Sequence, residues 1–474
     1  METAKLLASD GADADQFGSS VATDGTTVIV GAPFDDDIHT DAGAAYLYDV
    51  ATGVEIAKLL PDDGYAGQNF GWTVEVSGSV ALVSAWLDDL TTKTGAVYLF
   101  DTTTGLQLAK LHASDASYGD GFGRSLATDG TIAIIGTYYD SDNGPGSGSA
   151  YLFDITTGTQ LAKLLPDDGA AYDYFGYAVG ISGTTAVVGA YRDSDYGQHS
   201  GAAYVFDTTT GLQTAKITPA DGAAYDYFGY AVGISGTTIV VGAPQDTPSG
   251  PDSGSAYLFD ATTGGQIAKL LPLWGSEDDH FGHDVAISDN IALVGMSNYN
   301  TSPPGSAYLF DATTGSQIIE ISPDTGIEGD DFGISVSITG TTILVGAATD
   351  DDSGHYSGSG YLFELRDLCP TLTVDPMPLI MEQSATFSVT NMMPNKATYL
   401  AYSVVGTGNT YIAPLNVTLG LDAPRQAGGS VTTDASGMAQ WVLPIPATKP
   451  YQSVWLQACQ RNFKSDLVTT YIVQ

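Results

Sequence analysis

Short apolar runs, separated by glycine-containing turns, recur along the first 366 residues. One run in each unit resembles Thr27–Ala32, which shows no alternation of apolar and polar positions. Such a run is typical of a strand buried on both faces. Two further runs resemble Tyr151–Asp154 and Gln160–Leu164, and no segment shows a convincing helical period. The pattern predicts an all-β chain of short strands.

The dipeptide Phe-Gly recurs seven times, at intervals of 51 to 53 residues. A first strand begins at each copy, so every unit carries four predicted strands. Four short strands in a fixed period of this length are typical of one propeller blade, and seven copies predict a seven-bladed β-propeller. The phenylalanines of the seven copies are Phe17, Phe70, Phe122, Phe175, Phe228, Phe281 and Phe332.

A tight turn is predicted between the first and second strands of each unit. Six units place glycine there, which supplies the positive φ that two-residue hairpins need. The sixth unit has Asp289, a residue type that tolerates this conformation better than most. The six glycines are Gly25, Gly78, Gly130, Gly183, Gly236 and Gly340.

The seventh unit lacks a fourth strand after Tyr361–Phe363. Glu2–Leu7 at the other end of the chain matches the fourth strand Glu55–Leu60 of the first unit. We therefore expect the N-terminal strand to complete the seventh blade and close the ring.

Composition changes near residue 366. Residues 1–366 hold 49 of the 55 acidic and 10 of the 15 basic residues, whereas 367–474 are almost neutral. We predict the propeller over 1–366 and a small β-sandwich, Ig-like domain over 367–474, where short strand-like runs alternate with turn signals. Cys369 and Cys459 flank this domain, which favours one disulfide; two buried free thiols are the alternative.

The net charge of −40 excludes nucleic acid as an expected partner, because phosphates would be repelled. It suits cations, cationic partners or a saline medium. No apolar run approaches 18 residues, so no transmembrane helix is expected. Met1 almost directly precedes a predicted strand, so we expect a mature chain whose secretion signal has been removed and which is extracellular or displayed at a cell surface.

Six lysines share one repeat position on the predicted outermost strand of a blade. Lysine at an exposed sheet edge discourages edge-to-edge pairing, and a role in binding is the alternative. The lysines are Lys5, Lys58, Lys110, Lys163, Lys216 and Lys269.

Acidic residues concentrate in two sets of loops that a propeller brings to one face: the connections between second and third strands, and those between blades. Alternate aspartates in the first set could hold a hard cation such as Ca²⁺, and solvated carboxylates are the alternative. The predicted metal ligands are Asp35, Asp37, Asp140, Asp142, Asp193, Asp195, Asp350 and Asp352.

In the second set, an aspartate stands two positions before Phe-Gly in six units. It either adds to the acidic rim or caps backbone N–H groups of the turn. These residues are Asp15, Asp120, Asp173, Asp226, Asp279 and Asp330.

Aromatic residues are predicted on the same face, where rings and carboxylates together suit sugar recognition. The candidate ligand-binding residues are Trp86, Tyr138, Tyr139, Tyr172, Tyr191 and Tyr225. Isolated exposed tyrosines are the alternative. The six histidines are scattered over different units and no nucleophile motif occurs, so we expect no catalysis, although paired carboxylates of a glycosidase are the open alternative.

The units resemble the FG-GAP repeats of integrin α-chain propellers and of bacterial secreted proteins. The second half of that motif is complete in Gly31-Ala32-Pro33 and Gly242-Ala243-Pro244 and varied elsewhere. The resemblance implies extracellular binding or adhesion. Integrin-type repeats often carry a calcium loop between first and second strands, but here that connection is only a short turn, so their usual calcium site does not carry over.

The sequence thus predicts a non-catalytic binding or adhesion protein that uses the acidic loop face, assisted by calcium, with a glycan or a surface protein as ligand. One alternative is a structural subunit of a filament or surface layer that self-associates through 367–474. Another is the binding part of a polysaccharide-active enzyme.

Overall fold

The computed structural model describes residues 2–365, apart from 90, 274, 298–304 and 324–328, and the strands between residues 371 and 473. The chain divides into two compact units, one formed by Glu2–Phe363 and the other containing Glu364–Gln474. Each unit is considered by itself below. No helix in the described part of the chain is long and apolar enough to cross a membrane.

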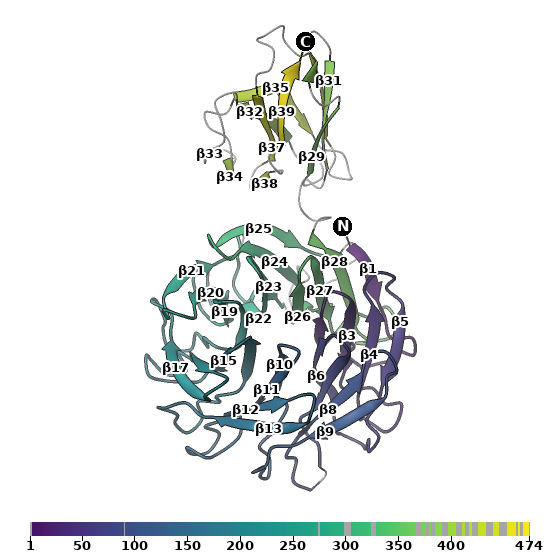
Figure 1. Ribbon diagram of the computed structural model, residues 1–474, viewed down its shortest axis with the longest axis vertical. Helices are drawn as coiled ribbons and strands as arrows, with labels where there is room; N and C mark the ends of the chain where they lie inside the picture. Colours follow the sequence, from purple (N-terminus) through teal and green to yellow (C-terminus); the bar gives the residue numbers. More distant parts are fainter. Residues whose placement is uncertain are drawn as a thin grey trace. The chain divides into compact units, whose positions relative to one another are not determined.

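The first unit is a ring of seven four-stranded antiparallel sheets (Figure 1). This confirms the predicted seven-bladed propeller. The first three blades are β2 (Ser20–Thr23), β3 (Thr27–Ala32), β4 (Ala44–Asp49) and β5 (Glu55–Leu59); β6 (Phe70–Ser77), β7 (Val80–Ala85), β8 (Ala96–Asp101) and β9 (Gln107–Leu111); and β10 (Ser125–Thr128), β11 (Ile132–Thr137), β12 (Ser149–Asp154) and β13 (Thr159–Leu164).

The next three blades repeat the same order. They are β14 (Ala178–Ser182), β15 (Thr185–Ala190), β16 (Ala202–Asp207) and β17 (Leu212–Ile217); β18 (Ala231–Ser235), β19 (Thr238–Ala243), β20 (Ser255–Asp260) and β21 (Gln266–Leu270); and β22 (Phe281–Ser288), β23 (Ile291–Met296), β24 (Ser306–Asp311) and β25 (Ser316–Ile321).

The seventh blade joins the two ends of the propeller sequence. Its strands β26 (Phe332–Thr339), β27 (Thr342–Ala347) and β28 (Ser359–Glu364) are completed by β1 (Glu2–Leu6). Strand β1 runs antiparallel to β28, with Lys5 opposite Tyr361 and Leu6 opposite Gly360. The predicted closure by the N-terminal strand is therefore confirmed, and it gives β28 a partner on its outer edge.

The hairpin turns between first and second strands have the predicted backbone conformation. All six turn glycines adopt positive φ, between 55° and 92°, and Asp289 in the sixth blade has a φ of 51°. A side chain other than glycine rarely adopts this conformation, and aspartate is among those that do so most readily.

The Phe-Gly phenylalanines are the core residues of the blades. Phe175 is fully buried and packs edge-to-face against Tyr204 at 5.4 Å and Phe206 at 5.7 Å between ring centroids. The chain also passes very close to its neighbour at this point: a Cβ on Gly201 would lie 1.9 Å from the carbonyl oxygen of Phe228 in the next blade. The repeated glycine before the third strand is therefore required by contact between blades as well as by its φ of 82°.

The second unit is described by its strands alone. One sheet has the order β29-β31-β36, a second has β30-β39-β37-β32-β35 with β38 beside β37, and β33 pairs with β34. The predicted β content is present. The packing of a sandwich and the disulfide stay predictions, because Cys369 lies outside the described residues. The strands are β29 (Thr371–Asp375), β30 (Leu379–Ile380), β31 (Ser384–Thr390), β32 (Ala397–Ser403), β33 (Thr410–Ile412), β34 (Val417–Leu419), β35 (Arg425–Thr432), β36 (Ala439–Pro444), β37 (Ser453–Gln460), β38 (Phe463–Lys464) and β39 (Val468–Val473).

Candidate functional site

Each repeat-position lysine lies in a cluster of aspartates on the loop face. In the third blade, Nζ of Lys163 lies 2.7 Å from Oδ2 of Asp115, 2.8 Å from Oδ2 of Asp140 and 2.7 Å from Oδ2 of Asp142. Asp140 and Asp142 belong to the loop between second and third strands, and Asp115 to the connection from the preceding blade. The cluster confirms that the two sets of acidic loops share one face.

A buried tyrosine completes each network. The hydroxyl of Tyr151, on the third strand, lies 2.8 Å from Oδ1 of Asp115 and 3.1 Å from Oδ2 of Asp140. Ion pairs of the same kind, with two or three aspartates each, recur at five other lysines. They are Lys5 with Asp350 and Asp352; Lys58 with Asp10, Asp35 and Asp37; Lys110 with Asp63 and Asp88; Lys216 with Asp168, Asp193 and Asp195; and Lys269 with Asp221 and Asp246.

These contacts correct the sequence-based interpretation of the lysines. The residues do lie on outermost strands, as predicted. Their side chains, however, are only 15% to 21% exposed and point to the aspartates rather than protecting a free sheet edge. The lysine and aspartate positions of each repeat therefore form an ion-pair network that joins the outermost strand to the loops.

The sixth blade lacks both charges of this network. Glu320 occupies the lysine position, and Tyr299, which lies outside the described residues, occupies the first aspartate position. The hydroxyl of Tyr308 contacts Sδ of Met296 at 3.7 Å, and Glu320 accepts a hydrogen bond from the hydroxyl of Ser306. The one blade without the lysine also lacks the aspartate, which indicates that each charge is kept only where the other can pair with it.

The predicted metal ligands lie within these clusters. Asp35 and Asp37 approach each other together with Asp10, as Asp140 and Asp142 do together with Asp115, closely enough that one ion could bridge each group. Each group already bonds to its own lysine ammonium, Lys58 in the first and Lys163 in the second. Calcium binding by these loops stays a prediction, and it would have to displace or rearrange a lysine.

The aspartates before Phe-Gly act as caps. Oδ2 of Asp173 accepts a hydrogen bond of 2.7 Å from the backbone N–H of Ala170, and the same bond forms in four other blades. Burial raises the pKa of Asp15, Asp120, Asp173 and Asp226 to about 6. The second blade has Gln68 at this position: its side-chain oxygen accepts the equivalent bond from the backbone N–H of Tyr65 at 3.3 Å, and its amide nitrogen also donates to Asp88.

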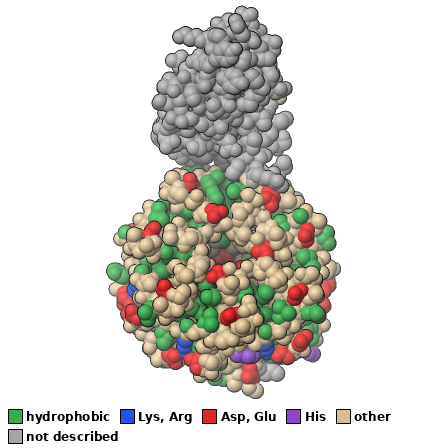
Figure 2. Space-filling view, in the orientation of Figure 1, with side chains coloured by type: hydrophobic (Ala, Val, Ile, Leu, Met, Phe, Trp, Pro, Cys, Tyr) green, Lys and Arg blue, Asp and Glu red, His purple; other side chains and the backbone are tan. Residues whose placement is uncertain are grey.

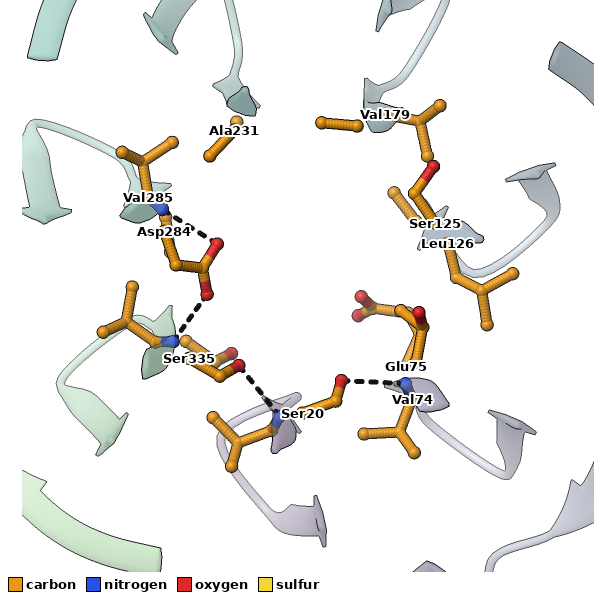
Figure 3. A pocket seen from close by; sticks show the side chains of 18 of the residues that line it. Ser20, Val74, Glu75, Ser125, Leu126, Val179, Ala231, Asp284, Val285 and Ser335 are labelled. Carbon is orange, nitrogen blue, oxygen red and sulfur yellow. Dashed lines mark hydrogen bonds between the residues drawn. The ribbon is translucent and has the colours of Figure 1, made fainter. Parts of the chain in front are cut away.

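A cavity of about 670 Å³ runs through the centre of the ring, lined by the innermost strands. The face in Figure 2 is hollowed at its centre, with Asp and Glu side chains spread around the opening and few Lys or Arg side chains visible. Glu75 and Asp284 direct their carboxyl groups into this channel (Figure 3).

Asp284 also joins neighbouring blades. One carboxyl oxygen accepts the backbone N–H of Val285, and the other accepts that of Val336 in the next blade at 2.7 Å. Ser20 and Ser335 stand at the same repeat position and accept equivalent bonds from Val74 and Val21 (Figure 3). The position is therefore a structural link around the channel.

Aromatic side chains of the second to fifth blades gather beside the channel mouth. Rings of Trp72 and Trp86 lie 5.2 Å apart, and those of Tyr177 and Tyr191 lie 4.4 Å apart. The guanidinium of Arg124 connects the two groups, since it lies over the rings of both Trp72 and Tyr177. We call this set the aromatic cluster: Trp72, Trp86, Tyr138, Tyr139, Tyr174, Tyr177, Tyr191, Tyr227 and Tyr230.

Four of the six predicted ligand-binding residues belong to the aromatic cluster: Trp86, Tyr138, Tyr139 and Tyr191. The other two, Tyr172 and Tyr225, are 57% and 47% exposed outside it, and Tyr225 contacts the ring of His199.

Sequence reasoning missed Trp72, Arg124, Tyr177 and Tyr230. Each directly follows Phe-Gly, where the other blades have Ser19, His283 and Ile334. The residue after Phe-Gly varies within an otherwise constant repeat, and this variation is the sequence feature that could have indicated a functional position. The start of each innermost strand faces the channel, so this position forms a ring of side chains at its mouth.

A seven-bladed ring with loops and varied side chains gathered around a central opening defines a propeller of the platform type, a fold that is consistent with a binding role. The FG-GAP repeat model matches all seven units, at residues 1–48, 54–100, 106–153, 159–206, 212–259, 265–310 and 316–363. The chain belongs to the FG-GAP repeat family.

Other comparisons inform the fold alone. The chain is similar to the structure described as "Crystal structure of RRP9 WD40 repeats", with a TM-score of 0.50 and 11% identity over 76% of this chain and 97% of that one. No curated protein matches the chain in sequence.

Proposed function

We propose that this chain is a non-catalytic binding or adhesion protein, extracellular or displayed at a cell surface, whose ligand is a glycan or a surface protein bound on the loop face. The observation that carries the proposal is the aromatic cluster beside the channel mouth. Aromatic rings that remain partly exposed around a concave opening supply the apolar contact area that ligand sites use.

The position of the cluster supports binding rather than a purely structural role. Phe175 and its equivalents already fill the interior of the blades, so the aromatic cluster is additional to the core. Tyr139 is 41% exposed, and the rings of Tyr138 and Tyr139 lie 3.9 Å apart. Such rings favour flat ligands with apolar faces, and among surface ligands we favour a glycan.

The test uses the intact chain on an array of glycans and matrix proteins, with calcium and with EDTA. We expect capture of a glycan, and a loss of about tenfold in affinity for Trp86→Ala and for Tyr139→Ser. Tyr118→Ser is the matched control, because Tyr118 is 76% exposed in a loop between two blades and lies outside the aromatic cluster.

The calcium arm decides whether the acidic clusters assist binding. Capture that needs calcium supports a role for Asp35, Asp140 and their equivalents, and capture unaffected by EDTA assigns the site to the aromatic cluster alone. Silence in both arms contradicts the proposal and favours a structural subunit. Release of a shortened glycan would show an enzyme instead.

A further inference from the structure

Two arginines of the propeller differ from its repeat-position lysines. Every such lysine bonds to an aspartate, whereas neither Arg124 nor Arg192 forms an ion pair with a carboxylate among the residues that the structure describes. The chain has 55 acidic residues, so carboxylates are not scarce. Partial burial of a guanidinium without an acidic partner carries a desolvation penalty, which an anionic ligand would offset.

Arg124 is held by rings at the channel mouth. Its guanidinium carbon lies 4.2 Å from the ring centroid of Tyr177, 5.7 Å from that of Trp72 and 5.8 Å from that of Tyr138. Contacts with ring faces hold the charge in place but leave most of its five in-plane N–H donors to bond elsewhere. The residue also lines the central cavity, so these donors border space that a ligand can enter.

Arg192 extends the same arrangement to the neighbouring blade. Its guanidinium carbon lies 4.8 Å from the ring centroid of Tyr174 and 5.4 Å from that of Tyr191. Its Nε is buried and has no hydrogen-bond acceptor. Because Tyr191 and Tyr177 are in contact, the two arginines belong to one continuous surface.

On the basis of the function proposed above, we propose that the channel mouth binds a glycan whose sugar units carry a carboxylate, such as a uronic acid. The sugar ring stacks on the aromatic cluster, and the carboxylate accepts paired hydrogen bonds from the guanidinium of Arg124. Guanidinium and carboxylate match in this two-pronged geometry, which a lysine cannot reproduce. The cavity lies in the size range of small-ligand sites.

An anionic ligand in the channel would meet two carboxyl groups, Asp284 and Glu75, whose charges are offset in different ways. Both oxygens of Asp284 bond to backbone N–H groups of Val285 and Val336. Burial raises the pKa of Glu75 to about 8, so its carboxyl group is mostly protonated at neutral pH and can donate a hydrogen bond to a sugar hydroxyl.

The net charge of the chain acts at longer range. At physiological ionic strength, electrostatic interactions are screened beyond about 8 Å, so repulsion from distant aspartates weakens while contacts inside the site persist. We therefore expect the affinity for an acidic sugar to hold or rise when salt is added. If binding instead depended on an exposed basic patch, the affinity would fall when salt is added.

The experiment compares matched sugars by titration calorimetry with the full chain. The probes are oligosaccharides of glucuronic, galacturonic and mannuronic acid, each beside its counterpart in which the carboxyl group has been reduced to a hydroxymethyl group. We expect at least one acidic probe to bind about tenfold or more tightly than its reduced counterpart, the size of effect expected from a charge-assisted hydrogen bond.

Variants locate the preference. Arg124→Gln should abolish the difference between acidic and reduced sugars, and Arg192→Gln should decrease it. Lys93→Gln is the matched control, because it removes one positive charge from an exposed loop outside the aromatic cluster, and it should keep the preference. Thermal unfolding followed by circular dichroism verifies that each variant is folded.

The outcomes separate this inference from the function on which it rests. Equal binding of acidic and reduced sugars, or a preference that survives both arginine substitutions, overturns the inference and leaves sugar binding intact. Failure of every sugar and every array ligand overturns both. If Arg124→Gln does not fold, the matched sugars on the unmodified chain still decide, because that comparison needs no variant.

Discussion

The ammonium nitrogen of Lys163 lies 2.8 Å from Oδ2 of Asp140, 23 residues earlier in the chain. The lysine is on the outermost strand of its blade and the aspartate is in the loop between the second and third strands, so the bond ties the edge of the sheet to the loop face. The same two repeat positions are joined in six blades, which makes this pair the main electrostatic element of the repeat.

Removing the lysine should destabilise the propeller. In Lys163→Met the apolar stem is kept, but buried Asp140 loses its cation, and we expect the free energy of unfolding to fall by about 1–3 kcal/mol. Chemical denaturation measures the change. Adding Asp140→Asn should restore part of the loss, whereas Lys93→Met should change stability by less than about 0.5 kcal/mol. Equal effects of Lys163→Met and Lys93→Met would contradict the role of the pair.

The lysine also gives a sharp test of calcium binding. Lys58 bonds to Asp10, Asp35 and Asp37, so a calcium ion in this cluster competes with the ammonium group. Lys58→Gln should therefore show a larger rise in melting temperature with added calcium than the unmodified chain does. Lys93→Gln serves as the control for the change in net charge. A variant that does not respond to calcium would show that these carboxylates do not form a calcium site even when the lysine is absent.

Stability should depend on pH in two opposite ways. Burial raises the pKa of Asp15, Asp120, Asp173 and Asp226 from 3.8 to about 6 in the folded state. The folded chain then binds protons more tightly than the unfolded chain, so this stabilisation is present at low pH and is lost as the pH rises through about 6.

The carboxyl groups of Asp115 and Asp168 change stability with pH in the opposite direction. Burial opposes ionisation, but hydrogen bonds from lysine and tyrosine lower the pKa of both carboxyls, so their stabilisation is lost as the pH falls below 3.8. Urea midpoints measured across this range should decrease from about pH 4 to about pH 6, and the decrease should be smaller in Asp173→Asn. A steady increase over that interval would contradict the assignment.

Close contact between blades makes one class of glycine essential. Gly201→Ala would place a Cβ 1.9 Å from the Phe228 carbonyl oxygen at a φ of 82°, so we expect severe loss of stability or of soluble protein. Gly265→Ala is the control, because only a hydroxyl oxygen of Thr263 lies near its added Cβ, at 3.2 Å. Circular dichroism during heating compares the two variants. Similar melting temperatures would show that the blades can move apart.

The N-terminal strand should be required for a closed ring. Deleting residues 1–7 removes the partner of β28 and the ion pairs of Lys5, and it exposes an unpaired strand edge. We expect a lower denaturation midpoint and self-association through that edge, seen by gel filtration. A synthetic peptide of residues 1–8 should reverse both effects, and a peptide with Lys5→Glu should do so less well. Unchanged stability after the deletion would contradict closure by this strand.

The period of Phe-Gly, the turn glycines and the match between Glu2–Leu7 and Glu55–Leu60 were enough to predict seven blades and their closure. These features are local: strand burial, positive φ and strand similarity are each written within a few residues, and repetition multiplies the signal sevenfold. The caps formed by Asp173 and its equivalents were also within reach, because the bond spans only three residues.

The partners of the lysines and the composition of the site depended on the tertiary structure. Lys163 and Asp115 are 48 residues apart and come from different blades, so no local pattern reveals their bond. Arg124 likewise contacts Trp72 and Tyr177 only because successive inner strands converge on the channel. The repeat can be predicted from local sequence patterns, whereas the contacts between positions of different repeats follow from the closed ring, because blade geometry sets the distances between those positions.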